Sequence, residues 1–376
     1  MSGQDFIRSL PSGQGLTGPR RLYRVHLDPV LLLALVAVIG CGLVILYSAL
    51  NKDAAVFGAQ LSRMGLALVA LLIAAQLPPR LYLRWSPLIY GLGLLLLVAV
   101  LLVGVKVKGS QRWLDLPGLP RFQPAELMKI AVPMMVAWYL NERTLPPSFK
   151  HLLYALVIIA APAALIGIQP DLGTALLVGA AGLSVVLFAG IYWRWIGFSV
   201  LAAALAAPGL WLVMKDYQRQ RVLTLFDPES DPLGTGWNII QSKTAIGSGG
   251  VFGKGLFQGT QSHLEFLPES QTDFIIAVVG EEVGLVGVSV LLLLYVVIIA
   301  RGLYIATQAQ NTYSRLLAGA LTLTFFVYVF VNIAMVSGLL PVVGVPLPLV
   351  SYGGTSAITL LASFGIVMSI HTHRGW

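Results

Sequence analysis

The sequence predicts an all-α, polytopic membrane protein with ten transmembrane helices and one large extracytoplasmic loop between helices 7 and 8. Hydrophobic residues make up 57% of the 376 residues and charged residues only 11%, whereas a soluble domain typically carries about 25% charged residues. One soluble core could not bury so much apolar surface, which excludes a cytosolic enzyme. The single cysteine excludes a secreted scaffold held by intrachain disulfides.

Ten apolar runs are long enough to cross a hydrocarbon core of ~30 Å, which takes about 20 helical residues. These runs cover residues 30–50, 60–77, 87–105, 125–140, 152–169, 172–190, 196–214, 275–300, 316–338 and 352–370. We therefore expect an N-terminal cytoplasmic tail, a single ten-helix domain with a periplasmic loop, and a short cytoplasmic C-terminus. Their boundaries are 1–28 for the tail, 29–371 for the domain, about 215–274 for the loop, and 372–376 for the C-terminus.

The distribution of charge sets the expected orientation. With the N-terminus inside, the cytoplasmic segments hold twelve Lys and Arg residues against three acidic residues, which is the bias of the positive-inside rule. An even number of spans then places both termini in the cytoplasm. The first 28 residues lack the apolar core of a signal peptide. Topology and anionic lipid account for the net charge of +8, so no nucleic-acid partner is expected.

Polar side chains at membrane depth mark functional sites, and most of those in this sequence lie on the predicted outer half. Glu126 and Lys129 are three residues apart at the start of the fourth span, so they share one helical face. Two compatible interpretations are a structural ion pair and an ammonium group that Glu126 positions for a lipid phosphate. The other candidate phosphate contacts are Arg63, Arg112 and Lys243.

Four carboxylates suggest different tasks. Asp273 ends the long loop and opens the eighth span, where it can either cap the helix or serve as general base for a sugar hydroxyl. Asp171 follows a proline and is expected to start the sixth helix. Glu281 and Glu282 lie deeper in the eighth span and are expected to pair inside the bundle.

The stretch 243–255 is glycine-rich and carries two lysines. Backbone amides together with lysines can cradle a phosphate, but a glycine-rich loop without a Walker pattern is a weak signal. The sequence has no spacing of His, Cys or acidic residues typical of a metal site. We therefore predict no protein metal site and no tightly bound cofactor.

The segment Pro341–Ser356 is predicted to shape the outer end of the site. Its prolines cannot extend a helix, and Gly353 and Gly354 allow the backbone to approach a ligand closely. Ser351 and Tyr352 supply hydroxyl groups that can orient a sugar or phosphate. No neighbouring base is evident that would make Ser351 a nucleophile.

Four stretches together resemble the shape, elongation, division and sporulation (SEDS) family. They are RFQPAELMK at 121–129, QPDLGT at 169–174, QSKTAIGSGG (241–250) with HLEFLPESQTDF (263–274), and NIAMVSGLLPVVGVPLPLVSYGGTS at 332–356. DYQRQRV at 216–222, FDPESDPLGTGWNIIQSK at 226–243 and the terminal IHTHR are similar to the elongation branch of the family in Gram-negative rods.

The resemblance implies a peptidoglycan glycosyltransferase of the cell inner membrane with its active site facing the periplasm. Such enzymes polymerise lipid II, a disaccharide-pentapeptide on undecaprenyl pyrophosphate, during cell elongation. Their partners are a class B penicillin-binding transpeptidase and the elongation machinery. The family's essential loop aspartate matches Asp273, and its fourth-span Glu and Lys match Glu126 and Lys129.

The implied reaction is a single inverting displacement in which Asp273 takes the proton of the acceptor's 4-hydroxyl. The pyrophosphate leaving group needs stabilising cations, for which Lys129, Arg63, Arg112 and Lys243 are candidates, together with Mg²⁺ or Mn²⁺ on the pyrophosphate. Two alternatives remain open, a lipid II flippase and a non-enzymatic scaffold for a transpeptidase. A flippase would need polar residues across the inner half, where this sequence has few.

Overall fold

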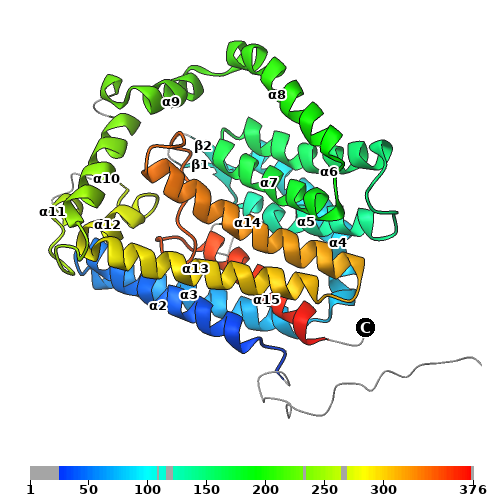
Figure 1. The fold of residues 1–376 in the computed structure, drawn as a ribbon, viewed down its shortest axis with the longest axis horizontal. Coiled ribbons are helices and arrows are strands. Elements are labelled where there is room, and N and C mark those ends of the chain that lie inside the picture. Colours follow the sequence, from blue (N-terminus) through cyan, green and yellow to red (C-terminus); the bar gives the residue numbers. More distant parts are fainter. Residues whose placement is uncertain (1–24, 108–109, 116–121, 232–233, 264–268, 374–376) are drawn as a thin grey trace, which may run out of the picture.

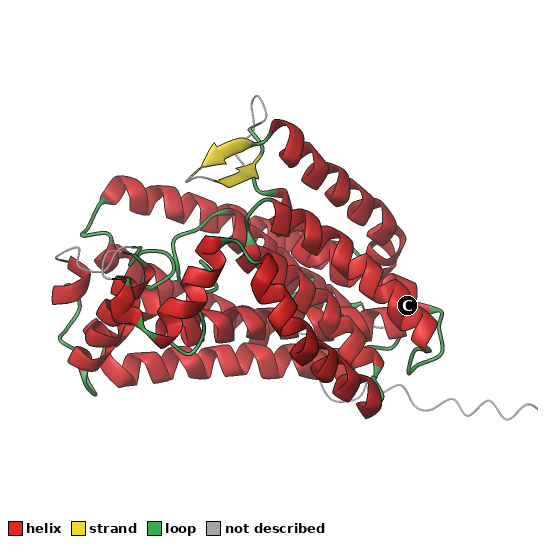
Figure 2. Ribbon diagram, turned by 90° about the horizontal axis from the view of Figure 1, so that it is seen from above, coloured by secondary structure: helices red, strands yellow, loops and turns green. Residues whose placement is uncertain are grey.

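The computed structural model describes residues 25–107, 110–115, 122–231, 234–263 and 269–373. These residues form helices and one short hairpin at an edge of the molecule (Figure 2). The long helices are α2 (Pro29–Ala49), α3 (Ala54–Gln76), α4 (Pro79–Val103), α5 (Pro124–Asn141), α6 (Phe149–Ile168), α7 (Leu172–Ala189), α8 (Trp193–Val213), α13 (Gly284–Thr307), α14 (Thr312–Val336) and α15 (Thr355–Thr372).

Each of these ten helices overlaps one of the predicted spans. Among the described residues, eight of these helices are long and apolar enough to cross a membrane, and α5 and α8 are outside that set. In α5, charged and proline residues lower the mean hydropathy. The prediction of an all-helical, polytopic membrane protein is confirmed.

The eighth predicted span, 275–300, is wrong as a single helix. The chain forms α12 (Ile275–Glu282) and α13, with a break at Gly284, whose φ of +72° is costly for other residues. The loop segment 250–255 lies against the break and pairs with backbone groups on both sides of it. Leu285 N–H donates to the Gly250 carbonyl at 3.0 Å, and Lys254 N–H donates to the Glu281 carbonyl at 2.9 Å. These bonds satisfy polar groups that a broken helix would otherwise leave exposed to lipid.

The long loop between α8 and α12 is mostly helical. It contains α9 (Asp216–Phe226), the 3₁₀ turn η1 (Pro228–Ser230), α10 (Thr235–Gly249) and the single turn α11 (Thr260–His263). Figure 1 shows α8 and α9 as an arch away from the bundle and α10 returning to lie beside α12. The Ser242 hydroxyl on α10 donates to the Val336 carbonyl at the end of α14, at 3.0 Å. The loop therefore folds back on the bundle. Its residues 264–268 lie outside the described part of the chain.

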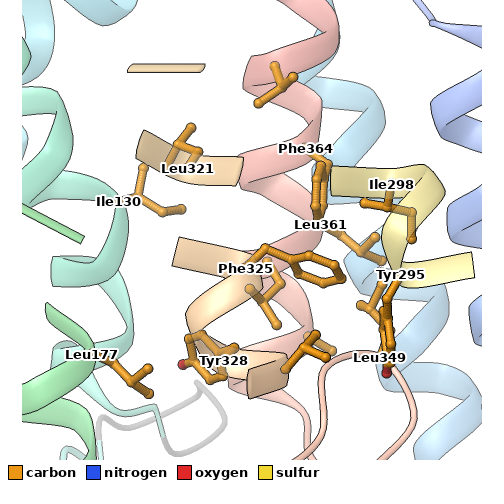
Figure 3. Packing of buried hydrophobic residues seen from close by; sticks show 14 of the residues in the cluster. Ile130, Leu177, Tyr295, Ile298, Leu321, Phe325, Tyr328, Leu349, Leu361 and Phe364 are labelled. Carbon is orange, nitrogen blue, oxygen red and sulfur yellow. The ribbon is translucent and has the colours of Figure 1, made fainter. Parts of the chain in front are cut away.

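The centre of the bundle is α14, with α15 beside it (Figure 1). About two thirds of the apolar part of each is buried, against about one fifth for α3 and α13. In the core, Phe325 of α14 packs edge-on against Tyr295 and Phe364, with ring centroids 5.6 and 4.9 Å away (Figure 3). This aromatic layer fills the middle of the bundle and gives α14 a fixed position.

The short hairpin of β1 (Val105–Val107) and β2 (Ser110–Trp113) follows α4 and precedes α5. Between α14 and α15 the chain forms an irregular segment, 337–354, with turns in place of a helix. The prolines and glycines of this segment predicted that outcome. The segment 337–354 lies against Asp273, because Asn332 bonds to the carbonyls of both Asp273 and Val345. The hairpin is at the same end, since Arg112 of β2 bonds to Pro170, close to where Gly173 meets Val343.

Candidate active site

Glu126 and Lys129 form the predicted ion pair in the first turns of α5. The Lys129 Nζ lies 2.6 Å from Glu126 Oε1, and both residues are less than a tenth exposed. Lys129 also donates a hydrogen bond to the Tyr328 hydroxyl on α14, and its Nζ lies 4.6 Å from the centre of that ring. The Thr359 hydroxyl on α15 donates to the second Glu126 oxygen at 3.2 Å. A buried charge is tolerated when it is paired and hydrogen-bonded in this way.

Asp273 lies at the start of α12 and is half-buried. Its backbone carbonyl accepts a 2.8 Å hydrogen bond from the Asn332 amide on α14, which also donates to the Val345 carbonyl at 2.7 Å. A Cβ atom on Gly344 would lie 3.5 Å from Asp273 Oδ2, so the carboxylate faces the backbone of the α14–α15 segment. The helix-cap interpretation is wrong, because the N-cap of α12 is Phe274.

Asp171 starts α7 as predicted, and its side chain accepts a hydrogen bond from Thr174 N–H at 3.2 Å. Its other oxygen accepts from the Gln123 amide at 2.8 Å and lies 3.6 Å from Arg112 Nη1. Arg112 of β2 also donates to the Pro170 carbonyl. The guanidinium is about one third exposed, so it can face a ligand while Asp171 holds it.

The α14–α15 segment connects this ion pair to Asp273. A Cβ atom on Gly173, in the first turn of α7, would lie 2.6 Å from the Val343 carbonyl, and the next residue, Gly344, faces the Asp273 carboxylate. Gly173, two residues after Asp171, and Asp273 therefore both lie against one short stretch of backbone. This arrangement brings Arg112 to the same end of the bundle as the predicted base.

Ser351 has a structural task. Its hydroxyl accepts a hydrogen bond from Leu347 N–H at 2.8 Å and donates to the Thr272 carbonyl, which precedes Asp273. The neighbouring Tyr352 N–H donates to the Gln271 carbonyl at 2.8 Å. Ser351 and Tyr352 thus fasten the α14–α15 segment to the residues that lead into α12, as the predicted shaping role requires.

Arg63 of α3 lies over the Tyr352 ring, with its Cζ 5.0 Å from the ring centre. Gly354 leaves room for it, because a Cβ atom there would lie 2.8 Å from Arg63 Cδ. The Gly353 N–H donates to the Gln60 side chain at 3.3 Å. The structure therefore brings Arg63, a predicted phosphate contact, together with Tyr352, Gly353 and Gly354 of the predicted shaping segment, and the backbone of that segment is tied to α3.

The glycine-rich stretch packs against α12 and does not form an open phosphate loop. A Cβ atom on Gly249 would lie 1.9 Å from the Gly280 carbonyl, and one on Gly253 would lie 2.2 Å from the Glu282 carbonyl. These glycines permit close contact between two backbone segments. Lys243, six residues before Gly249 on α10, is exposed, and its Nζ lies beside Gly338 just after α14.

Glu281 and Glu282 pair inside the molecule as predicted. Glu281 Oε1 lies 2.8 Å from Lys254 Nζ and also accepts hydrogen bonds from the Thr260 hydroxyl and Gln261 N–H. Glu282 accepts from the Ser48 hydroxyl on α2 at 2.7 Å. Both carboxylates fasten α12 to its surroundings.

Sequence reasoning missed two site residues on α14, Tyr328 and Asn332. Both are polar groups within an apolar span, and they are four residues apart, so they share a helical face. That pattern is a signal in its own right, but the partners of these side chains lie 199 and 59 residues away. Within the described ranges, no three His, Cys, Asp or Glu residues gather as metal ligands would.

The family model described as a cell cycle protein, which takes in FtsW, RodA and SpoVE, matches residues 20–375. The chain belongs to this family. It is 56% identical to the peptidoglycan glycosyltransferase MrdB of Escherichia coli K12, over 93% of this chain and 95% of that protein.

Two solved structures of the family have the same architecture. The crystal structure of the rod shape determining protein RodA of Thermus thermophilus matches with a TM-score of 0.70 at 30% identity, over 93% of this chain and 97% of that one. A peptidoglycan synthase complex, described as coordinating polymerisation and crosslinking, contains a chain that matches with a TM-score of 0.82 at 33% identity, over 93% and 98%. The predicted enzyme class is confirmed: this family member is a peptidoglycan glycosyltransferase of the MrdB and RodA type.

Proposed function

We propose that the chain polymerises lipid II into glycan strands at the outer face of the cytoplasmic membrane during cell elongation, with Asp273 as general base. The supporting observation is that one helix, α14, holds both the proposed base, Asp273, and the buried cation, Lys129. Asn332 holds the backbone of Asp273 and Tyr328 holds Lys129, one turn apart on α14. We infer that the Asp273 carboxylate and the buried Lys129 ammonium group act on the same substrate.

The chemistry follows from the substrate. The donor sugar is α-linked to pyrophosphate and the product bond is β, so one inverting displacement is the simplest route. Asp273 accepts the proton of the acceptor's 4-hydroxyl, the oxygen bonds to the donor anomeric carbon, and the bond to undecaprenyl pyrophosphate breaks. The leaving group departs as an anion and needs fixed positive charge in place of an acid. Lys129, Arg63, Arg112 and Lys243 supply that charge.

Three of these cations are held in different ways, which suits different tasks. Lys129 is buried and fixed by Glu126 and Tyr328, so it suits the phosphate nearest the reacting carbon. Arg112 and Arg63 are partly exposed at the edge and suit recognition of the incoming lipid. We further propose that Mg²⁺ or Mn²⁺ enters as part of the substrate, bound to the pyrophosphate.

The membrane arrangement extends the eight apolar spans to ten. We include α5 and α8, because each is as long as a spanning helix and each follows directly on another span, α4 or α7, in the order of the long helices. Both termini then lie in the cytoplasm of an inner-membrane protein, with the tail 1–28 inside and the loop between α8 and α12 in the periplasm.

A class B penicillin-binding transpeptidase is the proposed partner, together with other proteins of the elongation machinery. The support is the similarity to a chain in a complex that coordinates polymerisation and crosslinking. The loop between α8 and α12 is the longest stretch of chain between two of the long helices. Its helix α10 contacts α12, so a partner bound to α10 could act through α12 on Asp273, which lies two residues before α12 begins.

The bundle centre favours a polymerase over a flippase. Directly inward of Tyr328, the rings of Phe325, Tyr295 and Phe364 pack together (Figure 3) and each is less than a tenth exposed. A sugar headgroup crossing here would have to displace this aromatic layer. The described residues thus offer polar groups to the headgroup at the outer end of α14, without a polar route through its middle.

The experiment uses the purified full-length chain, alone and with its transpeptidase, and labelled lipid II. The wild type should form glycan polymer, and Asp273→Asn should form none although it remains folded, because the amide keeps the shape and loses the basic oxygen. Near-normal polymer from Asp273→Asn would contradict the general base. Transbilayer movement of lipid II without polymer would support the flippase, and neither activity, with binding to the transpeptidase intact, would support the scaffold.

A further inference from the structure

Two side chains of α14 bond to the two groups that we assign to the reaction, Lys129 and Asp273. Tyr328 and Asn332 are separated by four residues, so they lie on one face about 6 Å apart along the helix axis. Tyr328 contacts Lys129, and Asn332 contacts the backbone of Asp273. Neither residue carries a charge, and both are almost completely buried.

The orientation of the Asn332 amide is fixed by its partners. Its Nδ2 donates to the carbonyls of Asp273 and Val345, and two carbonyl oxygens can be satisfied only by the NH₂ end of the amide. The two bonded carbonyls belong to different segments, the start of α12 and the stretch that follows Gly344. One side chain therefore joins α14 to both backbones that surround the Asp273 carboxylate.

Tyr328 restricts Lys129 in a comparable way. A lysine ammonium group sits on a flexible four-carbon stem, so a defined position requires several contacts. Glu126 supplies one, and Tyr328 supplies its hydroxyl as acceptor and its ring face as a cation–π partner. The Tyr328 ring is itself held in the bundle centre that Figure 3 shows.

We propose that Tyr328 and Asn332 are a positioning pair, which sets the separation between the Lys129 ammonium group and the Asp273 carboxylate. The pair acts through Lys129 and Asp273 and does not contact substrate. The proposal rests on the proposed function, because it assumes that these two groups act in one displacement. The central, rigid position of α14 between α7, α13 and α15 makes this helix a suitable reference for both.

The expected effects are kinetic. A misplacement of about 1 Å can reduce a rate by about a hundredfold, while substrate binding that depends on many contacts changes little. Asn332→Leu preserves size and removes the donor, so we expect kcat to fall about 10- to 100-fold. Tyr328→Phe keeps the ring and removes the acceptor, so the fall should be smaller, roughly three- to tenfold. In both variants the KM for lipid II should stay within about twofold, because neither side chain contacts the lipid.

The matched control is Thr324→Val, one turn inward on the same helix. Its hydroxyl donates to the Ala320 carbonyl of α14 itself at 2.7 Å, so the substitution removes no hydrogen bond to Lys129 or Asp273. This variant should keep the kcat and KM of the wild type. Asn332→Gln restores an amide on a longer stem and should recover part of the kcat that Asn332→Leu loses.

The test is lipid II polymerisation by the full-length chain with its transpeptidase, measured against lipid II concentration, with the unfolding temperature of each variant. A loss of kcat at constant KM, absent in Thr324→Val and partly reversed in Asn332→Gln, supports the pair. A kcat within twofold of wild type in Asn332→Leu overturns it.

If Asn332→Leu does not fold, Tyr328→Phe decides: reduced kcat at wild-type KM supports the pair, and wild-type kinetics overturn it. A wild type without polymer would contradict the proposed function, whereas an active wild type, an inactive Asp273→Asn and a normal Asn332→Leu would contradict the pair alone.

Discussion

Two polar clusters lie at opposite ends of the bundle and use similar residue types differently. At the end that we propose faces the cytoplasm, called the inner end, Asp28 is fully buried and binds Arg301 and His371 at 2.7 and 2.8 Å while it caps α2 through Leu31 N–H. Burial alone would raise the pKa of Asp28, but the hydrogen bonds from His371, Arg301 and Leu31 hold this pKa well below its ordinary value. The inner carboxylate is thus enclosed by its partners.

The outer cluster is open by comparison. Asp273 and Arg63 are half-buried, Arg112 is about one third exposed and Lys243 is exposed, whereas Lys129 is held inside. Charged groups at the outer end can therefore meet a ligand without first losing a buried partner. The comparison teaches that pairing alone does not mark a functional site in this bundle. We infer the functional end of the bundle from its exposed cations together with the half-buried Asp273.

The largest effect on the outer cluster, after loss of Asp273, is expected from Lys129. Lys129→Ala removes a fixed cation from the pyrophosphate and leaves Glu126 buried without its ion pair, so activity should fall about 100- to 1000-fold. Lys129→Arg keeps the charge and should retain more activity. The measurement is the initial rate of lipid II polymerisation at matched protein levels.

Variants of Glu126, the ion-pair partner of Lys129, distinguish a structural role of the pair from a catalytic one. Glu126→Ala should also reduce activity, because Lys129 then loses the contact that holds it, at a cost of about 1–3 kcal/mol. The double variant with Ala at both positions should stay inactive. Activity restored in the double variant would show that the pair is structural, and the outer cluster would then resemble the inner one.

A smaller effect is expected from the segment between α14 and α15. Gly354→Val places atoms against the Arg63 side chain, where even a Cβ would lie 2.8 Å from Cδ, so polymerisation should fall about tenfold through the displaced guanidinium. Ser351→Ala should cost less activity, since the Ser351 hydroxyl bonds only to backbone groups, Leu347 N–H and the Thr272 carbonyl. The two rates, with intact mass spectrometry of the active protein, check this. An inactive Ser351→Ala together with a glycosylated Ser351 would replace single displacement with a covalent mechanism.

The smallest effect on activity is expected at the inner end. Asp28→Asn leaves Arg301 and His371 without their carboxylate and should lower the stability by about 3 kcal/mol, with kcat unchanged. Because the pKa of Asp28 is lowered on folding, its contribution is complete above the ordinary carboxyl pKa of about 4 and is lost as the pH falls through the folded value. The unfolding temperatures of wild type and variant should therefore differ by a constant amount from pH 8 to pH 5. A difference that disappeared between pH 7 and pH 5 would contradict this account.

The sequence predicted the features that depend on residues close together in the chain. Long apolar runs gave the helices, and the three-residue spacing gave the Glu126–Lys129 pair, because one helical turn brings such residues together. The break at Gly284 was missed, since it depends on backbone pairing with the loop at 250–255. The tasks of Tyr328 and Asn332 were missed for the same reason, because their partners come from other helices.

The central claim is that the open outer cluster performs the chemistry and the closed inner cluster holds the fold. The most direct measurement compares Asp273→Asn with Asp28→Asn in one preparation, by the kcat of lipid II polymerisation and the unfolding temperature. Asp273→Asn should lose kcat and keep the unfolding temperature of the wild type, whereas Asp28→Asn should keep kcat and unfold several degrees lower. Loss of kcat in Asp28→Asn at temperatures where it is folded, or polymer from Asp273→Asn at the rate of the wild type, would contradict the claim.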